Sequence, residues 1–337
     1  MSLIETRIRE IIPGDLYQIT LPLPFELEQV NVHLSRLANG GWMLHDSGFA
    51  DSRSFEILEA SLKELNVEWP QIQVLLLTHL HPDHVGLADR VSALAHPKIV
   101  MHEKEAAYLN EMIEVGKPTW FEPLHILGGT ARDQIAQIDQ EFLAMRRKLK
   151  RINPDIPLKG GEVLPTAYGP LEVIWTPGHS PGHVCLYARD RRLLFSADTI
   201  LKDITPNIAW LPGHDTLGEY LRSLQTLVPY EIDQVLPSHG MPFKGHRDWI
   251  AETTSHHEER CEQILKGAGT FKTAHELIGS IWSREFSNFH YHFAIGEVLA
   301  HLVYLEATGR VVRRETATGA AEWRDTNAII SGKDSQQ

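Results

Sequence analysis

The sequence has few of the features that mark secreted or membrane-spanning proteins. Only two cysteines, Cys185 and Cys261, occur in 337 residues, which excludes a disulfide framework and a metal site built from thiolates. No apolar run reaches the roughly 18 residues that a membrane span requires. Residues 1–25 lack the charged start, apolar stretch and cleavage site of a signal peptide. We therefore expect a cytoplasmic protein without a membrane partner.

Positive charge is also scarce. The chain has 32 Lys and Arg residues against 44 Asp and Glu residues, a net charge of −12. This excess of negative charge disfavours a permanent surface for nucleic acid or anionic lipid. The hydrophobic fraction of 42% and the charged fraction of 23% are typical of a globular protein, and the length suffices for one large core and a smaller domain. A small-molecule substrate is the expected partner.

Short strand-like segments alternate with helical segments through the first two thirds of the chain. Strands are predicted at 16–23, 30–37, 42–45, 74–77, 98–101, 171–175, 184–188, 193–196 and 234–236, and helices at 55–65 and 86–95. Strands interleaved with helices predict an α/β fold in which helices cover sheet layers.

Between the two sets of strands, residues 103–160 are predicted to be mainly helical. Within 130–151, apolar residues recur on one helical face, namely Ile135, Ile138, Phe142, Met145 and Leu149. The segment is either an ordinary packed insertion or a lid that shapes a substrate pocket, because elements inserted beside a site often have that role.

Beyond residue 245 the pattern becomes helical again. Helices are predicted at 247–265, 273–283 and 293–308, followed by a hairpin around Gly319, and these are the parts of a winged-helix domain. We therefore predict a catalytic domain over 1–245, which contains the insertion at 103–160, a winged-helix-like domain over 246–325 and a disordered polar tail over 326–337.

Four side chains that can bind metal are concentrated in one short segment. His79, His81, Asp83 and His84 follow the apolar strand predicted at 74–77. A single histidine is usually a core or surface residue, but three imidazoles and a carboxylate within six residues would be costly in a fold without a metal. Loops at the carboxyl ends of strands are where the sites of α/β proteins form.

Three further candidate ligands, His179, Asp198 and His239, follow later predicted strands. Asp198 has two oxygens and can bridge two ions. We predict one ion bound by His79, His81, His179 and Asp198, and a second bound by Asp83, His84, Asp198 and His239. Imidazole and carboxylate ligands suit borderline divalent metals, so we expect two Zn²⁺ ions, with Fe or Mn as alternatives. Two such ions can share one hydroxide and make it a nucleophile at neutral pH.

These motifs resemble those of the metallo-β-lactamase fold superfamily. The patterns His-x-His-x-Asp-His, Pro-Gly-His, Ala-Asp and Ser-His-Gly occur in the family's order over roughly residues 15–245. The resemblance implies an αββα sandwich with a dinuclear site at one edge of its sheets. It also implies that Asp46 supports the site without binding a metal. His183 has a weaker claim, as a packing or supporting residue.

The ligand set favours some branches of this superfamily over others. Secreted β-lactamases commonly have Cys or no bridging residue at the position of Asp198, and flavodiiron oxygen reductases have Glu in place of His81. Five histidines with a bridging Asp198 are similar to hydroxyacylglutathione hydrolases, lactonases, phosphodiesterases and nucleases. Persulfide dioxygenases keep similar ligands around one iron, which leaves the metal open. Lactonases often have a Tyr shortly after the bridging Asp, whereas Thr199 follows it here.

The resemblance implies a metal-dependent hydrolase in which a metal-bridging hydroxide attacks a thioester, ester or lactone carbonyl. Asp83 would orient the nucleophile and accept its proton. For the substrate we predict an apolar wall formed by Trp120, Phe121 and Trp210 and an anion contact from Lys202, although core packing explains the aromatic residues equally well.

Two alternatives come from other functional classes. The first is a phosphodiesterase or endoribonuclease, since residues 293–302 resemble the winged-helix domain appended to some endoribonucleases. Residues 246–325, however, contain nine Lys or Arg against twelve Asp or Glu. A domain with net negative charge is expected to bind nucleic acid poorly. The weakly basic hairpin with Arg310, Arg313 and Arg314 keeps that alternative open, but we favour a structural or dimerising role. The second alternative is a binding protein with a structural metal, against which the complete ligand set argues.

Overall fold

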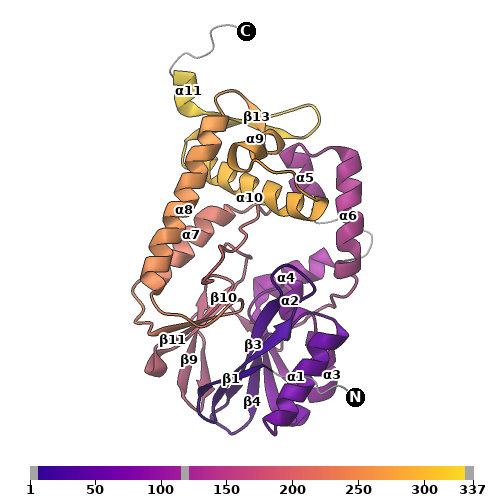
Figure 1. Cartoon of the computed structure of the whole chain (residues 1–337), viewed down its shortest axis with the longest axis vertical. Helices are drawn as coiled ribbons and strands as arrows, with labels where there is room; N and C mark the ends of the chain where they lie inside the picture. The colour runs from indigo at the N-terminus through magenta and orange to yellow at the C-terminus, as the bar shows by residue number, and fades with distance from the viewer. Residues whose placement is uncertain (1–6, 115–120, 331–337) are drawn as a thin grey trace. The chain divides into compact units, whose positions relative to one another are not determined.

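The chain folds into two compact units that interleave along the sequence (Figure 1). The computed structural model describes residues 7–114 and 121–330. The sheet unit comprises Met1–Glu114, Met145–Pro206 and Thr226–Trp249, and the helical unit comprises Val115–Ala144, Asn207–Gln225 and Ile250–Gln337. The insertion predicted at 103–160 is therefore divided between the two units, because only its middle part belongs with the C-terminal helices.

The sheet unit contains a seven-stranded sheet in the order β1-β2-β3-β4-β5-β6-β7. Its strands are β1 (Ile8–Ile12), β2 (Leu16–Pro22), β3 (Gln29–Arg36), β4 (Trp42–His45), β5 (Ile72–Leu77), β6 (Lys98–His102) and β7 (Ile156–Leu158). The first four strands pair antiparallel, and β4 to β7 pair parallel. The parallel half has its carboxyl ends at one edge, which is where the predicted ligand cluster begins.

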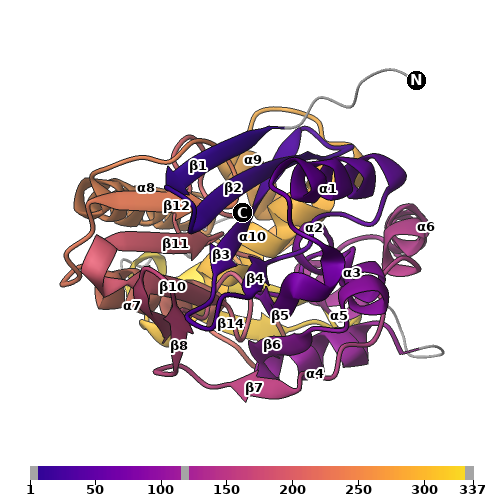
Figure 2. The same cartoon turned by 90° about the horizontal axis from the view of Figure 1, so that it is seen from below.

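A second, five-stranded sheet has the order β12-β11-β10-β9-β8. Its strands are β8 (Val163–Thr166), β9 (Gly169–Trp175), β10 (Val184–Ala188), β11 (Leu193–Ala197) and β12 (Gln234–Pro237). All neighbours pair antiparallel except β11 and β12, which are parallel. Figure 2 shows the two sheets as adjacent layers.

The space between the two sheets is filled by apolar side chains. Met43, Leu76 and Val100 from the first sheet belong to one buried cluster with Leu186 and Phe195 from the second. Alternating side chains of a strand point to opposite faces, so each strand supplies this core with every second residue. Burial of this surface is the main force that holds the sheets together.

Helices cover the other face of the seven-stranded sheet (Figure 2). The helices of the sheet unit are α1 (Ser52–Glu64), α2 (Pro82–Val85), α3 (Ala88–Ala95) and α4 (Glu103–Met112), with 3₁₀ turns at Trp69–Gln71 and Arg189–Arg191. The Asp51 side chain caps α1 by accepting from the Ser54 N–H at 2.8 Å. The same helix buries Phe55, Leu58 and Leu62 on one face, as the spacing of its apolar residues predicts.

The helical unit is built around α10, which is buried along most of its length. Its elements are α5 (Glu122–Gly128), α6 (Arg132–Arg146), α7 (Thr216–Leu227), α8 (His246–Gly267), α9 (Ala274–Ile281), α10 (Asn288–Ala307), α11 (Thr326–Ile330) and the strands β13 (Lys272–Thr273), β14 (Val311–Glu315) and β15 (Ala321–Asp325). The strands form a sheet in the order β13-β15-β14. The three helices and the hairpin predicted beyond residue 245 are present as α8, α9, α10 and β14–β15.

Two differences from the sequence expectations concern the ends of this unit. Helix α11 occupies the first five residues of the segment predicted to be a disordered tail, and the rest of that tail lies outside the described residues. Helix α7 was not among the predicted elements, although Leu217, Tyr220 and Leu224 are fully buried on one of its faces.

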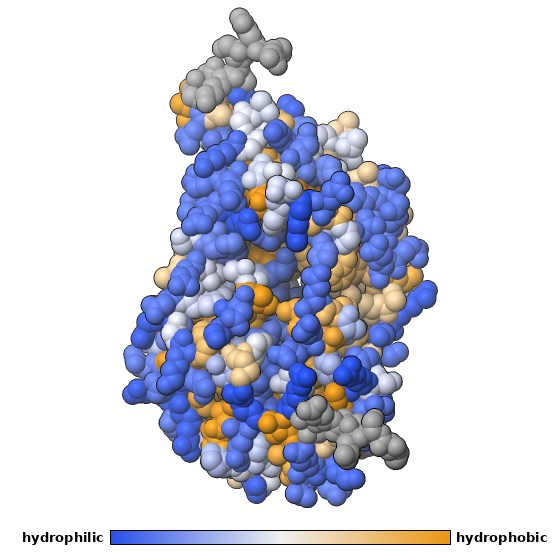
Figure 3. All heavy atoms as spheres, viewed as in Figure 1, coloured by the Kyte–Doolittle hydropathy of each residue, from blue (hydrophilic) through white to orange (hydrophobic). Residues whose placement is uncertain are grey.

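Among residues 7–114 and 121–330, no helix combines the length and the apolar character needed to cross a bilayer. Figure 3 shows a face on which hydrophilic residues predominate and hydrophobic residues are interspersed.

Candidate metal centre

The candidate ligands lie at the carboxyl ends of strands in the sheet unit. His79 and His81 follow β5, and Asp198 directly follows β11. Because β4 runs parallel to β5 and β11 runs parallel to β12, the loops after these strands emerge at matching edges of their sheets. The order of strands thus gathers ligands as far apart in the sequence as His79 and His239.

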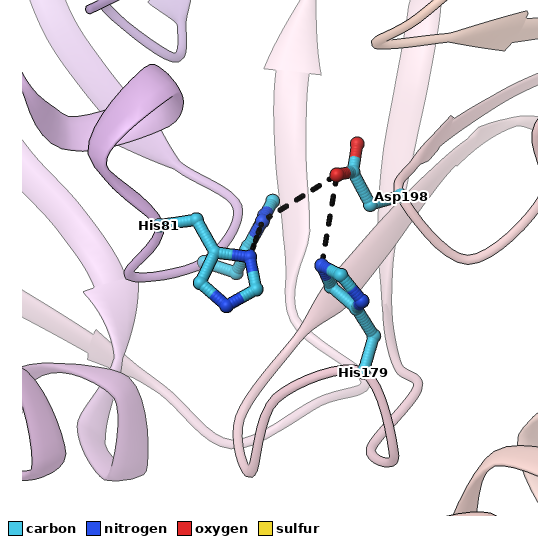
Figure 4. A group of neighbouring side chains, drawn as sticks. His81, His179 and Asp198 are labelled. Atoms are coloured by element: carbon cyan, nitrogen blue, oxygen red, sulfur yellow. Dashed lines mark hydrogen bonds and ion pairs between the residues drawn. The ribbon is translucent and has the colours of Figure 1, made fainter. Parts of the chain in front are cut away.

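The first group of ligands consists of His79, His81, His179 and Asp198, and one potential ligand atom from each lies within 4.8 Å of all the others. Nε2 of His79 is 3.1 Å from Nδ1 of His81 and 3.8 Å from Oδ2 of Asp198. Nε2 of His179 is 3.6 Å from the same Asp198 oxygen. Figure 4 shows the labelled side chains pointing toward one another.

The second group consists of Asp83, His84 and His239, whose potential ligand atoms also lie within 4.8 Å of one another. Nε2 of His239 is 3.3 Å from Oδ2 of Asp83 and 3.4 Å from Oδ2 of Asp198. Nε2 of His84 is 3.6 Å from Oδ2 of Asp83 and 3.6 Å from Oδ1 of Asp198. Asp198 therefore contacts both groups, and the structure brings together all seven predicted ligands.

The separations between these atoms fit metal coordination better than direct hydrogen bonding. Most are 3.3–3.8 Å, which is long for a charge-assisted hydrogen bond. Four ligands placed tetrahedrally at the usual 2.0–2.1 Å from a zinc ion would be about 3.3 Å apart. In addition, Nε2 of His84 and Oδ1 of Asp198 are buried without a hydrogen-bond partner among the described residues. The donor set therefore fits divalent metal ions.

The rings are oriented by bonds to their other nitrogens. Nδ1 of His84 is 2.8 Å from Oδ2 of Asp46, and Nδ1 of His239 is 2.8 Å from the carbonyl oxygen of Gln29. Both partners accept hydrogen bonds, so each Nδ1 carries the proton and each Nε2 offers its lone pair to the centre in the neutral ring. Such partners fix the tautomer and orientation of metal-binding imidazoles.

Burial and local charge divide the imidazoles into two classes. Burial and the neighbouring His84 and His81 hold the pKa of His79 well below its usual value, and burial lowers the pKa of His81 to about 3. Burial also opposes protonation of His239, but Asp198 and Asp83 outweigh it and raise its pKa to about 10. In the absence of a metal, the second group therefore carries protons that compensate its carboxylates.

The carboxylates respond in the opposite direction. Burial tends to raise the pKa of Asp83, but His84 and His239 outweigh it and lower the pKa to about 2. The pKa of Asp198 lies well below its usual value because His239 and His84 outweigh its burial. Both carboxylates are therefore ionised at neutral pH and available as ligands.

Asp46 directly follows β4 and bonds to the loop after β5, which carries His79 and His81. Its Oδ1 accepts from the Thr78 N–H and its Oδ2 from the Thr78 hydroxyl, both at 2.8 Å. The backbone of Asp46 has a φ of 61°, and that of Ala197, next to Asp198, has a φ of 43°. Left-handed conformations of non-glycine residues cost energy and are concentrated at functional sites. Asp46 thus contacts Thr78 and His84 through its side chain, and its role as a supporting residue of the site stays a prediction.

His183 is positioned against the backbone of Asp198. Its Nε2 accepts from the Asp198 N–H at 3.2 Å, so its proton is on Nδ1, which is 2.9 Å from Oγ1 of Thr176 and 3.1 Å from Oγ1 of Thr199. The ring is fully buried. This arrangement gives His183 a role in placing Asp198.

The predicted substrate residues that the structure describes are divided between the two units. Phe121 and Trp210 line a small pocket within the helical unit, together with Leu124, Ala209, Leu211, Pro212 and His292. Lys202 is exposed in the loop after β11, four residues beyond Asp198. Trp120 lies outside the described residues. The structure thus brings Phe121 and Trp210 together and leaves Lys202 as a separate feature of the sheet unit.

Glu105 is a residue of this region that the sequence analysis missed. Its side chain is completely buried at the start of α4 and accepts from the backbone N–H groups of Leu80 and Gly182. A signal was present, because Glu105 shares the buried face of α4 with Ala106 and Leu109. A charged residue on an apolar helix face needs a partner.

Comparison with protein families finds two matching regions of the chain. The family described as the metallo-beta-lactamase superfamily matches residues 26–239. The family described as the metallo-beta-lactamase-like C-terminal domain matches residues 261–326. The first match spans all seven candidate ligands and more than half of the chain.

Individual relatives cover different shares of the chain. A probable metallo-hydrolase of Bacillus subtilis, YqjP, is 24% identical over 311 residues, which are 87% of this chain and 92% of that protein. The acyl-coenzyme A thioesterase MBLAC2 of Bos taurus is 25% identical over 174 residues, which are 50% of this chain and 57% of that protein. The crystal structure of a metallo-beta-lactamase family protein from Thermus thermophilus has a TM-score of 0.80 and 28% identity, and the match covers 94% of this chain and all of that one.

Proposed function

Because the chain belongs to the metallo-β-lactamase superfamily and is a metal-dependent hydrolase, we propose that it hydrolyses a thioester, ester or lactone carbonyl at a centre for two divalent ions. The observation that carries this proposal is the convergence of two ligand groups on the shared carboxylate of Asp198. We assign His79, His81, His179 and Asp198 to one ion and Asp83, His84, His239 and Asp198 to the other, with Zn²⁺ as the expected metal.

The bound ions would polarise the substrate carbonyl and lower the pKa of a water to near 7. The protein's own contribution is to place and orient the reacting groups. Asp83 has a partly exposed side chain, and its Oδ2 faces His84 and His239. The other oxygen of Asp83 is the atom to which we assign orientation of the attacking water and acceptance of its proton.

Supporting residues keep these groups fixed during the reaction. Asp46 holds the His84 ring through Nδ1, and His183 holds the Asp198 backbone. Fixed ligands and dipoles stabilise developing charge without having to reorganise, which is the largest contribution in many hydrolytic sites.

A thioester is the substrate that we place first. The relatives from cattle, human and chicken that match about half of this chain are described as acyl-coenzyme A thioesterases. Thioester cleavage needs no strong general acid, because a thiolate is a better leaving group than an alkoxide. This suits a site in which the described acidic groups, Asp83 and Asp198, are both ionised at neutral pH.

The phosphodiesterase or endoribonuclease alternative depends on a basic surface in the C-terminal segment. Arg310 contacts Glu258 and Glu262, Arg313 contacts Glu315, and Arg314 contacts Glu322. Each arginine of the predicted basic hairpin thus has an acidic neighbour. Phosphate contacts dominate nucleic-acid affinity, so this surface gives the alternative no support.

For residues 246–325 of the helical unit we propose a winged-helix-like module with a structural or dimerising role. The order of helices and strands, with a three-stranded sheet β13-β15-β14 beside α8, α9 and α10, supports this assignment. Light scattering of the full chain would test dimerisation. A monomer at every concentration would contradict that part of the proposal.

The proposed activity can be tested with the metal-loaded full chain on acyl-coenzyme A thioesters, lactones, phosphodiesters, β-lactams and RNA. We expect hydrolysis of thioesters or lactones that falls to background in Asp83→Ala. Asp233→Asn is a matched control, because Asp233 is exposed and contacts only Arg192 at 3.8 Å among the ion pairs of the described residues. Thioester and lactone rates no higher than those of Asp83→Ala would refute the proposed substrate class.

A further inference from the structure

We propose that Glu105 is a positioning residue that ties together the two loops of the first ligand group and thereby sets the affinity of that group for its ion. One loop carries His79 and His81, and the other carries His179. The inference rests on the proposed metal centre, but it concerns a residue that is neither a ligand nor a contact of one.

The geometry of Glu105 is that of a bridge between backbones. Its Oε2 accepts from the N–H of Leu80 at 2.7 Å, and Leu80 lies between His79 and His81 in the sequence. Its Oε1 accepts from the N–H of Gly182 at 2.5 Å, in the turn that begins with His179. One carboxylate thus bonds to both loops, with one oxygen for each.

The local packing makes this bridge tight. Glu105 is 0% exposed, so water cannot replace either bond. A Cβ atom at Gly182 would stand 2.5 Å from Nδ1 of His102 and 3.0 Å from Cγ of Glu105. Only a residue without a side chain lets the turn approach α4 this closely. The absent side chain at Gly182 and the carboxylate of Glu105 are therefore parts of one arrangement.

The chemistry requires a carboxylate at this position. Both oxygens of Glu105 accept, and the two donors are backbone groups that cannot move without moving their loops. A glutamine of equal length has one oxygen and one NH₂ group, so one buried N–H would face another donor and lose its acceptor. An aspartate keeps both oxygens but is shorter by one methylene and cannot span the same distance.

The bridge serves one ligand group and not the other. Glu105 bonds to the loops of His79, His81 and His179, whereas the second group is held from other directions. There Asp46 bonds to His84, and the Gln29 carbonyl bonds to His239. Loss of the Glu105 bridge should therefore lower the affinity of the first ligand group for its ion and leave the affinity of the second group unchanged.

The test follows the release of metal from the full chain loaded with Zn²⁺ into an excess of a coloured chelator. His179→Ala and His239→Ala assign the two kinetic phases, because each removes a ligand of one group only. In Glu105→Gln we expect release from the His179 phase to be roughly 10-fold faster, the lower end of the range for lost direct partners of metal ligands, because Glu105 acts on the ligands through the loop backbones. The His239 phase should stay within about threefold of the wild-type rate.

Glu103→Gln is the matched control, because Glu103 lies on the same helix but is exposed and contacts Lys159 at 3.7 Å. It should leave both phases unchanged. Circular dichroism checks the folding of each variant, and Glu105→Asp, which keeps the charge, should show the same selective loss if the glutamine variant does not fold.

The outcomes separate the two proposals. If both phases of Glu105→Gln and Glu105→Asp keep the wild-type rate, or both accelerate equally, the role of Glu105 is refuted and the metal centre stands. If instead His179→Ala and His239→Ala each retain two ions, the proposed centre is wrong, and the inference about Glu105 falls with it.

Discussion

Replacing Asp46 by asparagine tests how the protein holds its second ligand group. The carboxylate of Asp46 makes three bonds of 2.8 Å, to the Thr78 N–H, the Thr78 hydroxyl and Nδ1 of His84. Asparagine can keep its oxygen opposite the Thr78 N–H, but its NH₂ group would then face the two remaining donors. The substitution therefore removes two hydrogen bonds without changing the volume of the side chain.

The expected magnitude follows from which bonds are lost. The bond to His84 stabilises the ring in the orientation in which Nε2 faces Asp83 and Asp198. Loss of such a partner typically weakens metal binding by 10- to 100-fold, which corresponds to about 1.4–2.7 kcal/mol. We expect this loss for the ion of His84 and a smaller loss for the ion of His79, because the Thr78 hydroxyl that loses its acceptor lies 3.1 Å from Nδ1 of His79.

The measurement is competition for Zn²⁺ between the protein and a chelator of known affinity, at fixed pH and ionic strength. Asp233→Asn is again the control, because it changes the same functional group at an exposed position. If Asp46→Asn binds both ions as tightly as the wild type, the orienting role that we assign to Asp46 is wrong.

Three further predictions concern packing, protons and the helical unit. Gly86→Ala should reduce the free energy of unfolding by about 1–3 kcal/mol in urea titrations, since its Cβ would collide with backbone atoms of Pro82 and Ala50; unchanged stability would contradict this. Apparent zinc affinity should rise about tenfold or more per pH unit between pH 7 and 9, because His239, with its pKa raised to about 10, must release a proton before it binds the metal. An affinity that does not change with pH would refute the release of this proton. Tyr291→Phe should cost about 1–2 kcal/mol, because its hydroxyl bonds to two side chains, and a thermal melt without any shift would disagree.

The sequence predicted the parts of the fold in which local pattern and tertiary structure agree. The strands at 42–45 and 184–188 were predicted with their observed bounds. The ligand cluster was recognisable because His79, His81, Asp83 and His84 directly follow an apolar strand. The resemblance then implied the metallo-β-lactamase fold, which the structure and the comparisons confirm.

Other elements were not predicted because their sequences show only weak periodicity of apolar residues. Strand β1 has no fully buried residue, and β7 is only three residues long, so neither shows a clear alternation of apolar and polar residues. Glu105 was missed because its place beside Ala106 and Leu109 indicates only that it needs a partner, and the backbone donors of Leu80 and Gly182 become apparent only in the fold.

The division of each unit into separate segments of the chain could not be predicted from the sequence. Linear boundaries at 245 and 325 treat the C-terminal helices as an appended segment, and the insertion at 103–160 as part of the catalytic domain. In the structure the middle of that insertion belongs to the helical unit, since a Cβ at Gly128 of α5 would meet Ile295 and Leu299 of α10. Only long-range packing shows this.

The packing of α5, from the middle of the chain, against α10 limits where the protein can be truncated. A truncation after residue 245 would strip Leu124 and His125 of their neighbours on α10 and expose surface that is buried in the intact chain. The segment after residue 245 therefore cannot be removed without disturbing the packing of α5.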